Sequence, residues 1–90
     1  MLLEIKIFGK LKCSLCESTK KKVEFLLDKW GMKESINVIF YDMESLDGLT
    51  EGAMLNATDI PTTIVTKDNV EVRRWAKEVP ESEELRSSLE

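Results

Sequence analysis

The sequence has 90 residues, of which 42% are hydrophobic and 33% are charged, and its formal net charge is −4. These values are typical of one small folded domain, residues 1–90, and exclude a disordered chain. The negative charge argues against nucleic-acid binding, and no apolar run approaches the ~20 residues of a membrane-spanning helix. The N-terminus has neither the basic segment nor the apolar run of a secretion signal. We therefore expect a cytoplasmic protein with no nucleic-acid or membrane partner.

Three elements are expected in the first half of the chain. Residues 2–8 alternate between two faces as a strand does, and Gly9 ends this run. In residues 14–30 apolar side chains recur every three or four positions, which predicts a helix, and Gly31 stands where a C-terminal cap glycine belongs. Residues 36–41 are apolar, β-branched and aromatic, which predicts a buried central strand.

The second half of the chain predicts a helix, a hairpin and a last helix. Apolar side chains recur at helical spacing within residues 44–56, and two glycines among them predict a short or irregular helix. These residues are Leu46, Leu49, Ala53 and Met54, with Gly48 and Gly52. Residues 62–66 and 70–75 are rich in β-branched residues and flank Lys67-Asp68-Asn69, so we expect a hairpin. Pro80 is expected to open the last helix.

The expected order of elements is β-α-β-α-β-β-α. A helix between two strands favours a right-handed parallel crossover, and the short turn after residue 66 forces the last two strands to be antiparallel. The sequence therefore predicts an α/β fold, a four-stranded mixed sheet with helices on both faces.

The only two cysteines, Cys13 and Cys16, stand where the loop after the first strand meets the first helix. Free N–H groups and the positive dipole at a helix N-terminus stabilise a thiolate at Cys13, and Lys10 and Lys12 add positive charge. The spacing places Cys16 on the same side, near enough to resolve a mixed disulfide formed at Cys13. The pattern predicts reversible thiol–disulfide exchange, in which Cys13 attacks.

Other uses of the cysteine pair are left open by the sequence. One CxxC supplies only two of the four ligands of a structural zinc site, so a metal would need a second copy or the ligands of a partner. A static disulfide is disfavoured in a reducing compartment, and a pair of inert thiols is a further alternative. Cysteine-protease chemistry is excluded because the chain has no histidine to activate the thiol.

These features together resemble the thioredoxin/glutaredoxin superfamily over essentially the whole chain. Three of them carry the resemblance: the strand-loop-CxxC-helix start, the Ile60-Pro61-Thr62 segment that opens the third strand, and the ββα ending. Lys10, three residues before the first cysteine, is similar to glutaredoxins. The segment Asp59-Ile60-Pro61-Thr62 looks more like thioredoxin.

The resemblance implies a cis-proline at Pro61 that faces the cysteines, with the backbone of Ile60 pairing with an extended substrate segment. The residues expected to bind substrate are Lys10, Lys12, Ser14, Leu15, Ile60 and Pro61. Ser14-Leu15 matches neither the Gly-Pro of thioredoxin nor the Pro-Tyr of glutaredoxin between the two cysteines. The glycine pair with which glutaredoxins hold glutathione is missing, because Arg73-Arg74-Trp75-Ala76 occupies that region.

We therefore expect a dithiol–disulfide oxidoreductase of the glutaredoxin/thioredoxin type, an electron carrier in cell redox homeostasis without a cofactor of its own. By resemblance its clients are protein disulfides, for example that of a ribonucleotide reductase. A thioredoxin-reductase-type flavoenzyme is expected to recycle it rather than glutathione, and the chain is expected to be a monomer. The alternatives are a metal- or cluster-binding module that uses the CxxC across a dimer, and a thioredoxin-fold adaptor without turnover.

Overall fold

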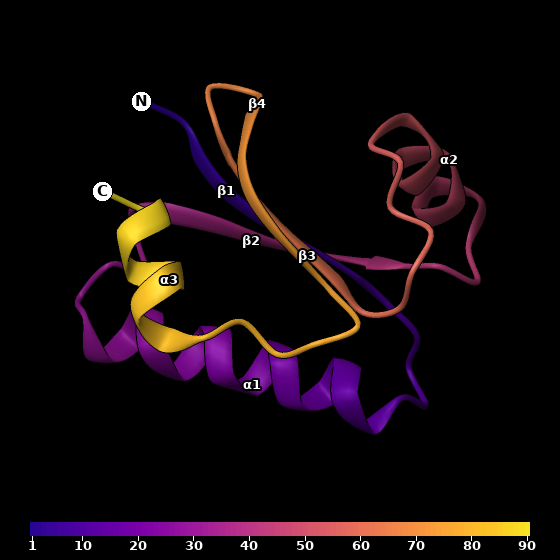
Figure 1. Cartoon of the computed structure of the whole chain (residues 1–90), viewed down its shortest axis with the longest axis horizontal. Helices are drawn as coiled ribbons and strands as arrows, with labels where there is room; N and C mark the ends of the chain where they lie inside the picture. Colours follow the sequence, from indigo (N-terminus) through magenta and orange to yellow (C-terminus); the bar gives the residue numbers. More distant parts are fainter.

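A single mixed sheet of four strands organises the chain (Figure 1). The elements of this computed structural model, which describes residues 1–90, are β1 (Leu3–Gly9), α1 (Ser14–Lys29), β2 (Ile36–Asp42), α2 (Leu46–Met54), β3 (Thr62–Lys67), β4 (Val70–Ala76) and α3 (Ser82–Ser88). The strand order is β2-β1-β3-β4. β1 and β2 run parallel, whereas β3 pairs antiparallel with both β1 and β4. The predicted element order and the mixed sheet are confirmed.

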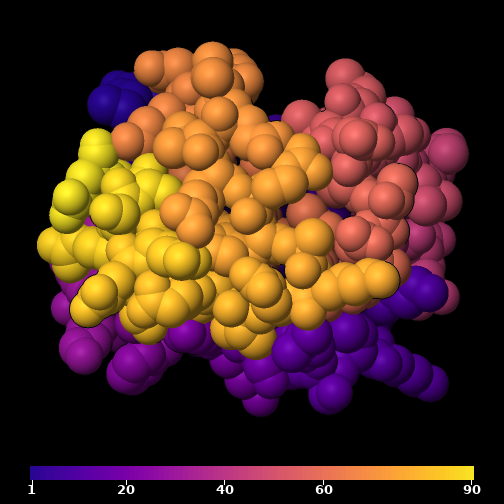
Figure 2. Space-filling model, in the orientation of Figure 1, coloured from indigo at the N-terminus to yellow at the C-terminus, as the bar shows by residue number.

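Helices cover both faces of the sheet, as expected. α1 and α3 enclose the larger buried cluster on one face, and α2 lies over the smaller one on the other face (Figure 1). The larger cluster is Ile5, Ile7, Val23, Leu26, Leu27, Ile36, Val65, Trp75, Leu85 and Leu89, and the smaller is Phe8, Met43, Ala57 and Ile64. Figure 2 shows the C-terminal segment, in yellow, lying against the indigo and violet of the N-terminal third. No helix has both the length and the apolar character that crossing a membrane requires.

β2 is an edge strand and not the buried central strand that its composition predicts. It pairs only with β1, and Ile36 is its one fully buried residue. The prediction was wrong because an edge strand covered on both faces needs the same apolar residues as a central one. Phe40 packs against the larger cluster and Tyr41 against the smaller. The central strands are β1 and β3, so β1 carries the chain into the middle of one end of the sheet.

α2 turns its glycines toward the sheet and its apolar stripe toward solvent. Gly48 and Gly52 are its two buried residues. A Cβ at Gly48 would overlap the carbonyl oxygen of Asp42, at the end of β2. Leu46 and Met54, from the stripe that predicted this helix, are 80% and 75% exposed. The close approach of α2 to the strand end leaves no space for side chains on its inner face.

The hairpin between β3 and β4 turns at Asp68 and Asn69, as expected. Their φ angles are 50° and 67°, the pattern of a type I′ turn, which matches the twist of the two strands. The Asp68 carboxylate also accepts the N–H of Leu2 at 2.8 Å, so the turn helps to hold the start of β1.

α3 begins at Ser82, two residues later than Pro80, where the sequence predicted its start. Glu81 is the N-cap, and its carboxylate accepts the N–H groups of Glu84 and Glu83 at 2.9 and 3.1 Å. These two hydrogen bonds hold the pKa of Glu81 below its ordinary value. A side-chain acceptor, rather than the fixed φ of a proline, therefore sets the first turn.

Gly48→Ala should destabilise the fold by about 1–3 kcal/mol, because the new methyl group overlaps a backbone oxygen that cannot rotate away. Urea unfolding measures the change. Leu49→Ala is the matched control: it removes a side chain that is 51% exposed and should change stability by less than about 0.5 kcal/mol. Equal stability of Gly48→Ala and the wild type would contradict the close approach of α2 to β2.

Glu81→Gln should destabilise the protein at neutral pH and should have no effect at strongly acidic pH. Because the folded pKa of Glu81 is lowered, its contribution is complete above about pH 4.3 and is lost as the pH falls through the folded pKa. Thermal unfolding across this pH range measures the difference. Glu78→Gln, at an exposed carboxylate without an ion pair or hydrogen bond, should follow the wild type throughout.

Candidate active site

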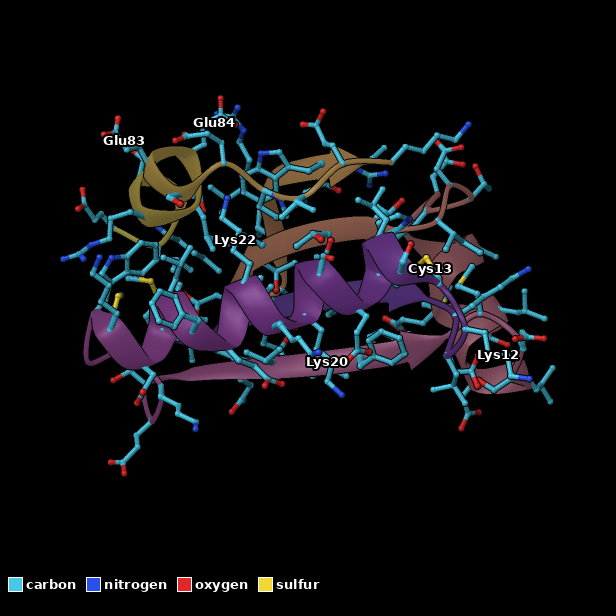
Figure 3. All side chains as sticks on the ribbon, turned by 90° about the horizontal axis from the view of Figure 1, so that it is seen from below. Lys12, Cys13, Lys20, Lys22, Glu83 and Glu84 are labelled. Atoms are coloured by element: carbon cyan, nitrogen blue, oxygen red, sulfur yellow. A yellow bond between two sulfur atoms is a disulfide. The ribbon has the colours of Figure 1, made fainter.

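The two cysteines lie at the end of the sheet where β1 and β2 both finish. Gly9, the last residue of β1, pairs in register with Asp42, the last residue of β2. Residues 10–12 then lead out of the sheet, and α1 follows directly after Cys13. Figure 3 shows Cys13 and Lys12 at this end of α1, with α3 near the other end.

Cys13 is the N-cap of α1 and forms a disulfide with Cys16, one turn into the helix. Its Sγ accepts the N–H of Cys16 at 3.1 Å, and its carbonyl accepts the N–H of Glu17 at 3.0 Å. The two Cα atoms are 5.2 Å apart, within the range that a disulfide spans. Cys13 is partly exposed, whereas Cys16 is only 1% exposed. A molecule in solution therefore meets the sulfur of Cys13 and not that of Cys16.

Gly9 provides the space that Cys16 occupies. It follows Ile5 and Ile7 on the face of β1 that α1 covers. A Cβ at Gly9 would lie 2.8 Å from Sγ and 3.0 Å from Cβ of Cys16, and 3.4 Å from the ring of Phe40. The sequence marked Gly9 only as the end of a strand. A glycine four residues before a CxxC could have indicated a close approach to the cysteines, but the sequence does not identify the side chain that packs against it.

Pro61 immediately precedes β3 and lies level with Gly9 at the end of β1. In the antiparallel pairing of β1 with β3, Phe8 is opposite Thr62, so the residue before Thr62 is level with the residue after Phe8. The peptide bond before Pro61 is cis, as the resemblance implies, and its side chain is buried. The register thus brings Pro61 next to the glycine that contacts Cys16.

The end of β4 holds the segment around Pro61. The Pro61 carbonyl accepts the N–H of Lys77 at 2.7 Å, and the Lys77 ammonium lies 3.6 Å from the Asp59 carboxylate. Lys77 has a φ of 60°, a left-handed conformation that costs a lysine about 1–2 kcal/mol. Residues 73–76, expected in place of the missing glycine pair, are the end of β4, and Lys77 is the first residue after it. The N–H and carbonyl of Ile60 make no main-chain hydrogen bond.

Lys77 and Asp59 were not anticipated from the sequence. A left-handed residue is normally signalled by Gly or Asn, and neither stands at position 77. The tie between Lys77 and Pro61 depends on β3 and β4 being paired in this register, so only the structure identifies it.

The residues that flank Cys13 in the chain face solvent. Leu11 and Leu15 are 73% and 40% exposed, and Lys10, Lys12 and Ser14 are exposed as well. Neither lysine belongs to any of the ion pairs in the structure. Four of the predicted substrate-binding residues are thus accessible close to Cys13 in the sequence: Lys10, Lys12, Ser14 and Leu15.

Other titratable groups with displaced pKa values lie on the α2 face of the sheet, opposite Cys16. Burial, reinforced by the negative charge of Glu51, raises the pKa of Tyr41, whose ring stacks on Phe8 at 4.9 Å. The hydrogen bond from Arg74 lowers the pKa of Glu71. The Arg74 guanidinium also donates to the main-chain carbonyls after α2, so this pair ties β4 to that helix.

The donor set at the site is limited to the two cysteines. No group of three or more His, Cys, Asp or Glu side chains is placed to hold a metal ion. Two thiolates supply half of the ligands of a tetrahedral structural zinc site, so a metal held here would need ligands from another molecule.

Comparison with known proteins identifies the fold. No protein-family model matches the sequence, and no curated protein is detectably similar to it. Thioredoxin-2 of the malaria parasite matches 98% of this chain over 81% of its own, with a TM-score of 0.77 and 17% identity. Thioredoxin O2 of Arabidopsis thaliana matches 98% over 72%, with a TM-score of 0.76 and 17% identity. Fasciola hepatica thioredoxin matches 98% over 78%, with a TM-score of 0.72 and 23% identity. The chain has a thioredoxin-like fold, with a disulfide-bonded CxxC pair at the start of its first helix.

Gly9→Ala should make the Cys13–Cys16 disulfide easier to reduce. The added methyl group collides with a Cys16 sulfur that the bridge holds in place, whereas the free thiol turns away. The contact with the Cys16 Cβ is the same in both forms, so only the collision with the sulfur counts, and about 1–3 kcal/mol there raises the reduction potential by about 20–65 mV. Equilibration with dithiothreitol measures this shift. Gly31→Ala, which strains a φ of 68° far from the bridge, should lower stability and leave the potential unchanged.

Proposed function

We propose that this protein is a dithiol–disulfide oxidoreductase that reduces protein disulfides in the cytoplasm. The Cys13 thiolate attacks one sulfur of a client disulfide and forms a mixed disulfide, and the client's other sulfur leaves as a thiolate. Cys16 then attacks Cys13, which releases the reduced client and closes the Cys13–Cys16 bridge. The client gains two electrons and two protons, and the protein is left oxidised.

The observation that carries the proposal is the unequal exposure of two cysteines that are close enough to bond. Cys13 is partly exposed and Cys16 is 1% exposed, so a protein client reaches only the first. The second lies within bonding distance behind it. This arrangement supports attack by Cys13 and release by Cys16, because the resolving thiol needs no access to the client.

The N-terminus of α1 supports the assignment of Cys13 as the nucleophile. The N–H of Cys16 points at the Cys13 sulfur at 3.1 Å, and unpaired helix N–H groups favour the anionic form of an N-cap group. Lys10 and Lys12 add positive charge, and neither forms an ion pair. Thiolate is the reactive species, so these features favour the attacking role.

Protein clients are favoured by the free backbone of Ile60. Its N–H and carbonyl are unpaired, and the next residue lies level with Gly9, beside the cysteine pair. An extended client segment that pairs with these groups places its own disulfide at Cys13. A ribonucleotide reductase is one such client that the resemblance suggests.

For recycling we propose a thioredoxin-reductase-type flavoenzyme rather than glutathione, with the protein acting as a monomer. Arg73-Arg74-Trp75-Ala76, in the region where glutaredoxins have the glycine pair that holds glutathione, form the end of β4 and contain no glycine. The missing glycine pair argues against glutathione as the reductant. Turnover with glutathione and glutathione reductase would contradict this part of the proposal.

Cys16→Ser should accumulate mixed disulfides with clients, and Cys13→Ser should accumulate none. Without Cys16 the attack at Cys13 still occurs, but nothing releases the client. Non-reducing gels and mass spectrometry detect the adducts, and insulin reduction measures turnover, which should be at background level in Cys13→Ser. A normal insulin rate in Cys13→Ser would falsify the mechanism. Stable partner complexes that survive the loss of both cysteines would instead identify an adaptor.

A further inference from the structure

The surface beside Cys13 is positive although the chain as a whole is negative. The formal net charge is −4, yet residues 9–14 contain two lysines and no carboxylate. Both Lys10 and Lys12 are exposed and belong to none of the ion pairs in the structure. Their charge is therefore available to an incoming molecule.

Two carboxylates close to the site are already paired with lysines. Glu17, whose N–H donates to the Cys13 carbonyl, lies 3.8 Å from the ammonium of Lys21. Asp59, two residues before Pro61, lies 3.6 Å from the ammonium of Lys77. Each pair reduces the repulsion that its carboxylate exerts on an anion beside Cys13. Asp42, in register with Gly9 at the end of β2, has no lysine partner, and the two unpaired lysines outnumber it.

Two exposed leucines lie close to these lysines in the sequence. Leu11, between Lys10 and Lys12, is 73% exposed, and Leu15, between the two cysteines, is 40% exposed. A single exposed leucine is ordinary on a protein surface. Here two of them flank the reactive sulfur together with two unpaired cations, so the surface offers apolar contact and positive charge side by side.

A client segment bound at this site passes these side chains. The unpaired N–H and carbonyl of Ile60 provide a place for an extended strand, next to Pro61 and therefore level with Gly9. The loop starts at the following residue, Lys10, and reaches Cys13 three positions later. The client residues on either side of the reacting cysteine are therefore those that meet the loop.

We propose that the site selects protein disulfides in which the reacting cysteine is flanked by acidic side chains and an apolar neighbour. The acidic groups pair with Lys10 and Lys12, and the apolar side chain contacts Leu11 and Leu15. The inference rests on the proposed function, because selection is expressed in the rate of attack by Cys13. The redox balance is that of the proposed function: two electrons and two protons pass to the client disulfide. In the assay, dithiothreitol reduces the Cys13–Cys16 bridge back to the dithiol.

The test uses three synthetic peptides of equal length, each with one internal disulfide and a leucine next to the reacting cysteine. Their other flanking residues are Asp and Glu, Asn and Gln, or Lys. The acidic peptide should have the highest kcat/KM at low ionic strength, about three- to tenfold above the neutral one, and the Lys peptide the lowest. High salt should bring the three values together, because exposed charges are screened.

Charge reversal identifies the residues responsible. In the double variant Lys10→Glu/Lys12→Glu the ratio of kcat/KM for the acidic peptide to that for the Lys peptide should invert. The ratio is the readout because it cancels any general effect of the substitutions on Cys13. The matched control is Lys29→Glu/Lys33→Glu, which changes the net charge equally at the far end of α1 and should keep the wild-type ratio.

Three outcomes would overturn the inference. Equal rates for the three peptides, or a preference that salt does not alter, would show that charge does not select the client. Oxidised glutathione reduced faster than every peptide would show that the lysines serve a small anionic disulfide instead. The neutral bis(2-hydroxyethyl) disulfide separates the two proposals. If it is reduced but the peptides are not ranked by charge, only the selectivity is wrong, and if nothing is reduced, the proposed function fails as well.

Discussion

The contact between Gly9 and Cys16 is the constraint on which the site depends. β1 ends at a residue without a side chain, and α1 approaches so closely that a Cβ there would lie 2.8 Å from the Cys16 sulfur. This approach buries Cys16 and leaves Cys13, one turn earlier, as the exposed cap of the helix. Because β1 is a central strand, Gly9 has a neighbouring strand on each side, β2 and β3. The cis-proline that precedes β3 lies level with Gly9 on one side, and Asp42 at the end of β2 pairs with Gly9 on the other.

Much of the fold could be predicted because its signals are local. Alternation in β1, helical spacing in α1 and the Asp68-Asn69 turn each depend on neighbouring residues, and all three were correct. The position of β2 in the sheet could not be predicted in this way, because composition reports how far a strand's faces are covered and not how many strands it pairs with. The orientation of α2 has a similar cause. Its inner face is set by backbone proximity at Gly48, which no pattern of apolar residues reveals.

The candidate site could likewise be predicted only where the signal is local. Residue type and spacing identified Cys13 and Cys16, and a resemblance in motif identified Pro61. Lys77 was missed, since its left-handed φ and its bond to the Pro61 carbonyl arise only when β3 and β4 are in register. Residues that act through a side chain were thus visible in the sequence. Gly9, which makes room by lacking a side chain, and Lys77, which acts through its N–H, were not.

Cys16 is part of both the hydrophobic interior and the candidate site. Both are possible because α1 is held against the sheet by other residues. Along its buried stripe, Val23 and Leu27 are 0% and 1% exposed in the larger cluster, several turns away from the cysteines. That packing fixes the helix against the sheet independently of the bridge. Trp75, in the same cluster, ties β4 to α3, because its indole N–H donates to the Glu84 carboxylate at 2.9 Å. Opening the bridge therefore frees two sulfurs at the helix N-terminus without releasing the helix, and this allows one short segment to cycle between oxidised and reduced forms on a fixed scaffold.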